Sequence, residues 1–192
     1  MSPASGTSEL LELDGRAAWR QWLAENHAGS TGVWLTIRKK GSGKTGLSYE
    51  DAVEEALCFG WIDGQINTLD GERYRQRFTP RRSGSTWAES NKQRVEKLIA
   101  QGLMQPAGLA QVAAAKADGR WHALDDLELL RVPPDLEAAL DAAPGAAAYF
   151  ASLSASTRKM LLYWLASAKR PETRQKRLEQ IVAAAAHGRT PF

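Results

Sequence analysis

The sequence predicts an α+β fold, in which a small antiparallel sheet packs on helices and an all-helical C-terminal subdomain follows. Three stretches rich in β-branched and aromatic residues predict the strands: "TGVWLTIRKK" from residue 31, "WIDGQINT" from 61 and "ERYRQRFTPR" from 72. From Pro106 onward the chain is alanine-rich and helical in pattern. We therefore expect a flexible leader over residues 1–8, an α+β domain with a basic cleft over 9–103, and a helical subdomain over 104–192.

The composition is that of an ordinary globular domain. With 192 residues, of which 43% are apolar and 24% charged, the chain can form a substantial core. No apolar run approaches the roughly 18–20 residues that span a bilayer, and the amino terminus lacks the layout of a secretory signal. We expect a cytoplasmic protein without a transmembrane segment. The single cysteine, Cys58, excludes an internal disulfide, and its apolar neighbours favour a buried, inert thiol over a nucleophile.

The first half of the chain contains two predicted helices. One covers about residues 14–27, and the other begins after Ser48, which is a good N-cap with Glu50 and Asp51 in the first turn. Gly60 is the expected end of the second helix. The loop "GSGKTG" that precedes it lacks the spacing of a phosphate-binding P-loop.

The two strands after Gly60 form a predicted hairpin, with its turn at Asp70 and Gly71. Side chains alternate between the two faces of a strand. The second strand therefore has Tyr74, Gln76 and Phe78 on one face, and Arg73, Arg75, Arg77 and Thr79 on the other. Three arginines on one face repel each other, so we expect an anionic group or ligand to offset them.

A further helix is predicted to start at Thr86, which forms a capping box with Glu89, and to end at Gly102. Trp87, Asn91 and Arg94 follow at helical spacing along one edge of it. In the C-terminal subdomain we expect a helix from Pro106 to Gly119 and three more, at about residues 135–143, 154–168 and 172–187.

The basic character of the chain is local. The net charge is only +3, yet the window from Arg73 to Lys97 contains eight basic residues and two acidic ones. The segment "TPRRSGSTW" combines Arg81 and Arg82 with the expected helix N-terminus, which favours a phosphate- or carboxylate-binding corner. A solvated basic loop is the alternative.

The candidate ligand-binding residues lie between the arginine-bearing strand and this helix. Asp63 is either a structural clamp for the arginines or an orienter of a ligand-binding arginine. The tryptophans beside arginines suit either stacking of a planar ligand or ordinary core edges. The candidates are Trp61, Asp63, Arg75, Arg77, Thr79, Arg81, Arg82, Trp87, Asn91 and Arg94.

No pattern in the sequence indicates catalysis. The three histidines have no metal-ligand spacing and lie near predicted helix ends or turns. The acidic pair Glu54 and Glu55 is interpreted as a hydrated helix face. We therefore predict no catalytic residue, no metal site and no cofactor.

Three stretches of the chain resemble the YdeI/OmpD-associated, bacteriocin-protection family. They are "YEDAVEEALCFGWIDGQ", the segment from "RFTPRRSGSTW" to "KADGRW", and the tail from "VPPDLEAALDAAPG" to "IVAAAAHG". The resemblance extends from about residue 10 to 190. It implies a role in resistance to antimicrobial peptides, an association with an outer-membrane porin and an envelope location, and it supplies no catalytic residue. The lack of an export signal conflicts with the envelope location.

These observations favour a stress-protection protein that binds an anionic, phosphate-bearing or aromatic ligand rather than catalysing a reaction. An anionic small molecule or an acidic partner is the expected ligand. One alternative is an enzyme that acts on a phosphorylated or nucleotide-like small molecule. The other is a nucleic-acid-binding protein, since basic residues lie on a strand and on the next helix.

Overall fold

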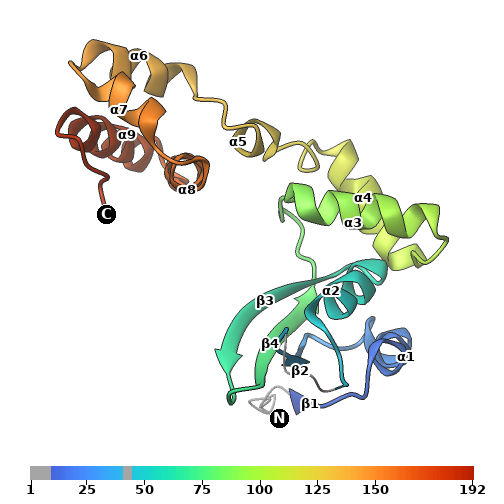
Figure 1. The fold of residues 1–192 in the computed structure, drawn as a ribbon. Helices are drawn as coiled ribbons and strands as arrows, with labels where there is room; N and C mark the ends of the chain where they lie inside the picture. The colour runs from blue at the N-terminus through green and yellow to red at the C-terminus, as the bar shows by residue number, and fades with distance from the viewer. Residues whose placement is uncertain (1–9, 41–44) are drawn as a thin grey trace, which may run out of the picture. The chain divides into compact units, whose positions relative to one another are not determined.

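The computed structural model describes residues 10–40 and 45–192 and divides the chain into two compact units. Unit 1 extends through His122, and unit 2 runs from Ala123 to Phe192 (Figure 1). The expected leader over residues 1–8 and most of the "GSGKTG" loop lie outside the described residues. The α+β class is confirmed, because unit 1 contains a sheet with helices and the described C-terminal part is helical.

The sheet of unit 1 has four strands, β1 (Leu10–Leu11), β2 (Val33–Arg38), β3 (Trp61–Thr68) and β4 (Arg73–Pro80). Their spatial order is β1-β2-β4-β3. β4 is antiparallel to both of its neighbours, whereas β1 is parallel to β2. The three predicted strands are confirmed, and β1 is an addition that the sequence did not indicate.

The predicted hairpin joins β3 and β4 through the turn at Asp70. One carboxylate oxygen of Asp70 accepts hydrogen bonds from the backbone N–H groups of Glu72 and Arg73, at 2.8 and 2.7 Å. The same side chain also accepts from the guanidinium of Arg73 at 2.8 Å. A register shift between Asp63 and Ile66 interrupts the ladder in β3, as expected of a β-bulge.

Helices α1 (Arg16–Asn26) and α2 (Tyr49–Cys58) cover one face of this sheet (Figure 1). Trp19 of α1 packs against Phe78 of β4 and donates from its indole N–H to the carbonyl of Ala52 in α2. Ser48 caps α2 as predicted, accepting from the backbone N–H of Asp51. We call the face of the sheet that carries Phe78 the inner face.

Helices α3 (Glu89–Ala100) and α4 (Pro106–Ala117) complete unit 1. The sequence placed the boundary between subdomains at residues 103 and 104, whereas the structure divides the chain after His122. The physical reason is the packing of α4 on α2. Gly108 lies directly against the carbonyl oxygens of Leu57 and Cys58, and the backbone N–H of Gln105 donates to the carbonyl of Cys58 at 3.0 Å.

Unit 2 is a bundle of short helices. They are α5 (Asp125–Glu128), α6 (Pro134–Ala142), α7 (Ala146–Ser152), α8 (Ala155–Ala166) and α9 (Pro171–Ala186). Leu136, Phe150, Leu161 and Ile181 are buried in its core. The three helices predicted for this region correspond to α6, α8 and α9, and the short helices α5 and α7 were not predicted. Within the described residues, no helix combines the length and the apolar character that crossing a bilayer requires.

Candidate functional site

The structure separates the predicted ligand-binding residues onto different faces of the sheet. Asp63 pairs with Phe78 and therefore points to the inner face, whereas Arg75 and Arg77 pair with Thr36 and Trp34 on the opposite, outer face. The expected convergence of Arg75, Arg77 and Arg81 on one cleft is not formed. The alternation that aligns Arg75 with Arg77 ends with β4 at Pro80, so it does not extend to Arg81.

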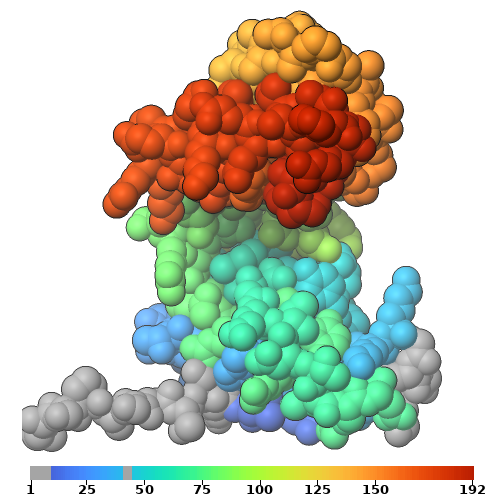
Figure 2. Space-filling view, turned by 90° about the vertical axis from the view of Figure 1, so that its left-hand side faces the viewer, coloured from blue at the N-terminus to red at the C-terminus, as the bar shows by residue number. Residues whose placement is uncertain are grey.

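The outer face is formed by the alternate residues of three strands. No described helix of unit 1 packs against it in Figure 1, and Figure 2 looks onto the side of unit 1 where β3 and β4 are exposed. Its members are Trp34, Thr36 and Arg38 of β2, Arg73, Arg75, Arg77 and Thr79 of β4, and Ile62, Gly64 and Asn67 of β3.

The arginines of the outer face are not equally neutralised. Arg73 forms ion pairs with Glu12 and Asp70, each at 2.8 Å, and Arg38 lies 3.7 Å from a carboxylate oxygen of Glu72. Arg75 instead stacks its guanidinium over the ring of Trp34, 4.8 Å from the centroid. Neither it nor Arg77 has an ion pair with any described residue.

Arg75 and Arg77 also have unused hydrogen-bonding capacity. The Nε of Arg75 and the Nη1 of Arg77 are shielded from solvent and have no hydrogen-bond acceptor. Two glycines lie near Arg77, Gly64 in β3 and Gly32 just before β2. A Cβ on Gly32 would lie 2.9 Å from its Nη2, and a Cβ on Gly64 would lie 3.9 Å from its Cβ. Gly32 therefore lets the Arg77 side chain lie close against the backbone, and Gly64 puts no side chain beside it on the β3 side.

Thr79 lies on the same face, beside Gly32, where its methyl group would be 2.7 Å from an added Cβ. Arg82 is exposed in the loop after β4. Of the ten candidates, only Arg75, Arg77 and Thr79 share the outer face. Trp34, which the sequence analysis did not select, joins them; its register pairing with Arg77 was the signal that would have identified it.

On the inner face, Asp63 is held by hydrogen bonds rather than by arginines. One of its carboxylate oxygens accepts from the hydroxyl of Tyr49 at 3.1 Å and from the side-chain amide of Gln76 at 2.8 Å. Burial raises the pKa of Tyr49 to about 12, and the charge of Asp63 adds to this effect. Tyr49 therefore remains a hydrogen-bond donor at neutral pH. The arrangement fixes the start of α2 to β3, which is a structural role for Asp63.

Arg81 and Trp87 form a buried pair. The guanidinium of Arg81 lies 3.8 Å from the centroid of the Trp87 ring, and its Nη1 donates to the carbonyl of Thr86 at 2.9 Å. Only 5% of Arg81 and 1% of Trp87 is exposed. Burial lowers the pKa of Arg81 to about 10, with Asp63 acting in the opposite direction, so the group stays charged at neutral pH. Arg81 covers the Trp87 ring, which is thus no open stacking surface.

Trp61 belongs to the core. It is 1% exposed, packs edge-on against Trp19 and Trp22, and donates from its indole N–H to the carbonyl of His27 at 3.2 Å. Its predicted role as a stacking wall for a ligand is replaced by core packing. Arg94 donates from Nη1 to the side-chain oxygen of Asn91 at 3.1 Å, so these two residues are close together as predicted. The Nε and Nη2 atoms of Arg94, however, donate to the two carboxylate oxygens of Glu50, at 2.8 and 2.9 Å.

The predicted anion-binding corner at the start of α3 is not formed. The helix begins at Glu89 with Ala88 as its N-cap and without a side-chain cap, so the capping box of Thr86 and Glu89 is wrong. The segment before Glu89 stays non-helical because the Thr86 carbonyl bonds to Arg81 and Trp87 is buried beneath that guanidinium. The acidic Glu89 in the first turn also disfavours an anion at this helix terminus.

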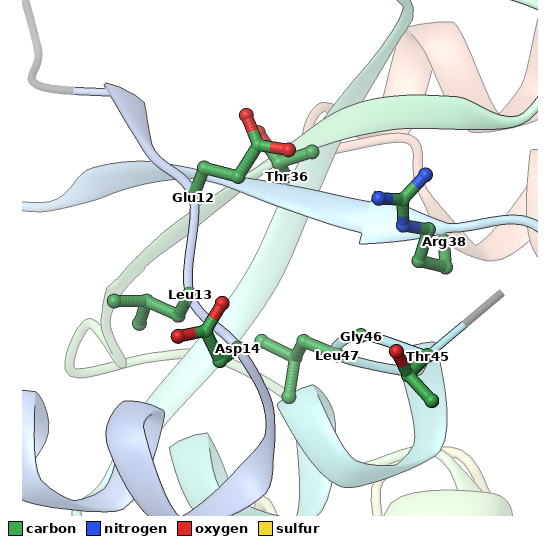
Figure 3. A pocket seen from close by; sticks show the side chains of 8 residues that line it. All are labelled: Glu12, Leu13, Asp14, Thr36, Arg38, Thr45, Gly46 and Leu47. Atoms are coloured by element: carbon green, nitrogen blue, oxygen red, sulfur yellow. The ribbon is translucent and has the colours of Figure 1, made fainter.

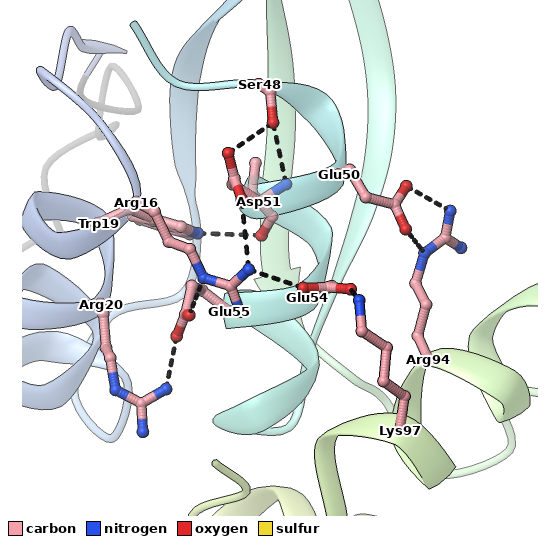
Figure 4. Close-up of polar contacts among 11 residues, drawn as sticks. Arg16, Trp19, Arg20, Ser48, Glu50, Asp51, Glu54, Glu55, Arg94 and Lys97 are labelled. Atoms are coloured by element: carbon pink, nitrogen blue, oxygen red, sulfur yellow. Dashed lines mark hydrogen bonds and ion pairs between the residues drawn. The ribbon is translucent and has the colours of Figure 1, made fainter. Parts of the chain in front are cut away.

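The acidic pair in α2 is buried, which corrects its interpretation as a hydrated helix face. Glu54 and Glu55 are each 2% exposed. Figure 4 shows the network around them, in which Arg16 bonds to both carboxylates, Arg20 bonds to Glu55 and Lys97 bonds to Glu54, at 2.6 to 2.8 Å. A hollow of about 440 Å³ adjoins the network. All four carboxylate oxygens accept from these cations, so the charge of both carboxylates is already compensated within the protein.

A second hollow, of about 240 Å³, lies beside β2 (Figure 3). Glu12, Asp14 and Arg38 supply its charged groups, and Glu12 is already paired with Arg73. Its lining includes Thr45, next to residues 41–44, which lie outside the described part of the chain. We assign no ligand to it.

Two further observations bear on chemistry. Cys58 is buried as expected, and burial raises the pKa of its thiol to about 11, which leaves it protonated and unreactive at neutral pH. Within residues 10–40 and 45–192, no group of three or more His, Cys, Asp or Glu side chains is arranged to hold a metal ion.

Comparison with known families finds two matches along the chain. Residues 11–111 match the family described as Domain of unknown function (DUF8412), and residues 130–188 match the family described as Bacteriocin-protection, YdeI or OmpD-Associated. The second match contains all of the resembling C-terminal tail, whereas "FGWIDG" and "TPRRSGSTW" lie in the first. Searches of curated proteins and of solved structures found no match. The first match covers more than half of the chain, so the protein belongs to the DUF8412 family, and it carries a C-terminal YdeI/OmpD-associated, bacteriocin-protection domain.

Proposed function

We propose that this bacteriocin-protection type protein acts as a binding module for an anionic ligand, and that the outer face of its sheet is the binding surface. One observation carries the proposal. Arg75 and Arg77 point to the same side of β4 and are not ion-paired with any described residue. Each also has a guanidinium nitrogen without an acceptor.

The energetics favour a bound anion at this position. Residues i and i+2 of a strand are about 6–7 Å apart along it, so the two like charges repel each other. A shielded guanidinium N–H without an acceptor also lowers stability, because desolvation is not compensated by a hydrogen bond. A phosphate or carboxylate bound between the two side chains relieves the repulsion, and guanidinium groups bind such anions with bidentate geometry.

The buried pair of Arg81 and Trp87 is the weaker candidate for the same function. The Nε atom of Arg81 and the Nε1 atom of Trp87 also lack hydrogen-bond acceptors. Both side chains are nearly fully buried, however. The half-exposed outer face is the more accessible surface. The expected cytoplasmic location stays a prediction.

The proposal is tested by titrating the protein with tripolyphosphate, a compact polyanion, in a calorimeter. Hydrogen bonds to charged groups contribute about 1.5–3 kcal/mol each. We therefore expect the double variant Arg75→Gln/Arg77→Gln to bind at least roughly tenfold more weakly than the wild type. The charge-matched control Lys169→Gln/Lys176→Gln removes two exposed cations of unit 2 and should leave the affinity nearly unchanged.

The outcome that contradicts the proposal is equal weakening by both double variants, because binding would then reflect net charge alone. Absence of any heat of binding with the wild-type protein would contradict it as well. Circular dichroism and the melting temperature of each variant show whether the fold is retained.

A further inference from the structure

We propose that the anionic ligand of the outer face is a single-stranded nucleic acid, an inference that rests on the proposed anion-binding function. The feature that goes beyond anion binding is Trp34. Its ring lies on the outer face directly opposite Arg77 in the strand register, and Arg75 covers it from the next row. An aromatic ring beside two unpaired guanidinium groups is the combination by which proteins bind single strands, with bases stacked on the ring and phosphates held by the cations.

The rows of the outer face give such a strand a path across the sheet. One row consists of Trp34, Arg77 and Gly64, and the next of Thr36, Arg75 and Asn67. Each row thus has one arginine in its centre. The first row adds a ring for stacking and a glycine, and the second adds the amide of Asn67, which can hydrogen-bond to a base edge or a sugar, whereas Thr36 is buried.

Two glycines near Arg77 have different effects on the approach of a sugar–phosphate backbone. Gly32 is held at a φ of 134°, and any side chain there would clash with Arg77 and Thr79 at less than 3 Å. Gly64 lies opposite Arg77 on the other neighbouring strand. Gly64 therefore puts no side chain beside Arg77 on the β3 side, where a phosphate can approach it, whereas its neighbour on β2 is Trp34.

The form of the surface favours a single strand over a duplex. The guanidinium of Arg75 lies over the Trp34 ring and must move to a phosphate before a base can take its place, and the ring itself is half-buried. It can stack only on a base that is brought to it, and in a duplex the bases are already stacked on each other and are not free to leave. A single strand can splay its bases onto a sheet face, which is also how four-stranded sheets bind RNA in other proteins.

The rest of the charge distribution agrees with this ligand. The other two arginines of the face, Arg38 and Arg73, are neutralised by carboxylates at the hairpin-turn end of the sheet. Unpaired positive charge is therefore concentrated beside Trp34. An acidic peptide would neutralise the same arginines, but it would make no use of the aromatic ring.

The test measures fluorescence anisotropy of a labelled oligothymidine of about ten nucleotides, a length within the usual site sizes. We expect the single strand to bind more tightly than its duplex with oligoadenine and more tightly than an oligoglutamate peptide of equal length. Because one stacked base accounts for about a fivefold effect or more, Trp34→Leu should weaken oligothymidine binding at least that much. It should weaken the binding of tripolyphosphate by a smaller factor than that of oligothymidine, because Arg75 and Arg77 are both retained.

Two further measurements sharpen the test. Between about 50 and 200 mM salt, the log–log slope of affinity should decrease by about 0.7 for each of Arg75 and Arg77 replaced by glutamine. Arg73→Gln, on the same face but already ion-paired, should change the slope by much less. Trp34→Phe keeps an aromatic ring and should retain most of the affinity, so a loss in Trp34→Leu alone identifies stacking rather than misfolding.

Each result decides a distinct claim. Tripolyphosphate binding without oligothymidine binding overturns the nucleic-acid inference and leaves the anion-binding function intact. No binding of either probe overturns both. Equal affinity for the duplex or the glutamate peptide, or an unchanged affinity in Trp34→Leu, shows that charge alone is recognised and ends the inference.

Discussion

The Nε atom of Arg16 donates to Glu55 at 2.6 Å, while the same guanidinium bonds through Nη1 to Glu54 at 2.7 Å. One side chain of α1 thereby neutralises two adjacent carboxylates of α2, both of which are almost fully buried. The second oxygen of Glu55 is taken by Arg20, and that of Glu54 by Lys97 of α3. This contact joins the first three helices of unit 1 through charge as well as through the apolar core (Figure 4).

Replacing Glu55 with glutamine should lower the free energy of unfolding of unit 1 by about 2–3 kcal/mol. Removing one partner of a buried ion pair usually costs about 3–5 kcal/mol. We expect the lower value because 34% and 30% of the side chains of Arg16 and Arg20 remain exposed, so water solvates them once the carboxylate is gone. Urea unfolding followed by tryptophan fluorescence measures the effect, since six of the seven tryptophans lie in unit 1.

A surface substitution of the same kind provides the control. Glu179→Gln on the exposed face of α9 should change the free energy of unfolding by less than about 0.5 kcal/mol. Glu55→Gln with a stability equal to that of the control would show that the network does not hold the helices together.

Lys97→Met should have a much smaller effect than Glu55→Gln, although Lys97 bonds to an equally buried carboxylate. The Lys97 side chain is 56% exposed, and Arg16 continues to neutralise Glu54 when the lysine is removed. Exposed partners contribute about 0–1 kcal/mol. The same urea titration measures this effect. A loss of unfolding free energy as large as that in Glu55→Gln would mean that the cation of α3, rather than the arginines of α1, stabilises the buried carboxylates.

Local patterns in the sequence were sufficient for the three longer strands and for most helices, because alternation, caps and glycine stops act within a few residues. They failed where the burial or pairing of a residue depends on a partner far away in the sequence. Glu54 and Glu55 lie 38 and 39 residues from Arg16 in the sequence, and no local pattern reveals that they are buried. The two-residue strand β1 has no alternation of its own and exists only by pairing with β2.

The candidate site could be predicted only in part for the same reason. The alternation in β4 correctly placed Arg75 and Arg77 together on one face. It gave no information on Arg81, since β4 ends at Pro80 and the backbone of Arg81 bonds to Gly60 instead. Trp34 was missed because its position beside these arginines depends on the pairing of β2 with β4.

Asp70 should titrate with a pKa of about 2 in the native protein. The backbone N–H of Glu72 is the main cause of the low pKa, and the guanidinium of Arg73 adds to it. A depressed pKa means that the carboxylate stabilises the hairpin fully above its unfolded pKa of about 3.8, and that this stabilisation is lost as the pH falls toward 2. NMR titration of the Asp70 carboxyl carbon measures the value directly.

Arg73→Gln should raise the pKa of Asp70 only part of the way toward 3.8, because the backbone N–H groups still bond to the carboxylate. Arg131→Gln, which removes a cation of unit 2, should leave it unchanged. A pKa of about 3.8 in the wild-type protein would contradict the turn geometry itself.

Gly108→Ala should destabilise unit 1 by about 1–3 kcal/mol, as overpacking in a closely packed contact does. A Cβ at this position would lie 2.3 Å from the carbonyl oxygen of Cys58 and 2.7 Å from that of Leu57. Both atoms are backbone, so α4 must move away from α2 and weaken the hydrogen bond from Gln105. Alanine is favoured over glycine in a helix by about 1 kcal/mol, which offsets a part of the loss.

Gly29→Ala is the matched control, since an added Cβ there has no atom within 4 Å and its φ is ordinary. Urea unfolding of both variants compares them, and a Gly108→Ala protein as stable as Gly29→Ala would mean that α4 does not pack on α2 as closely as the structure shows.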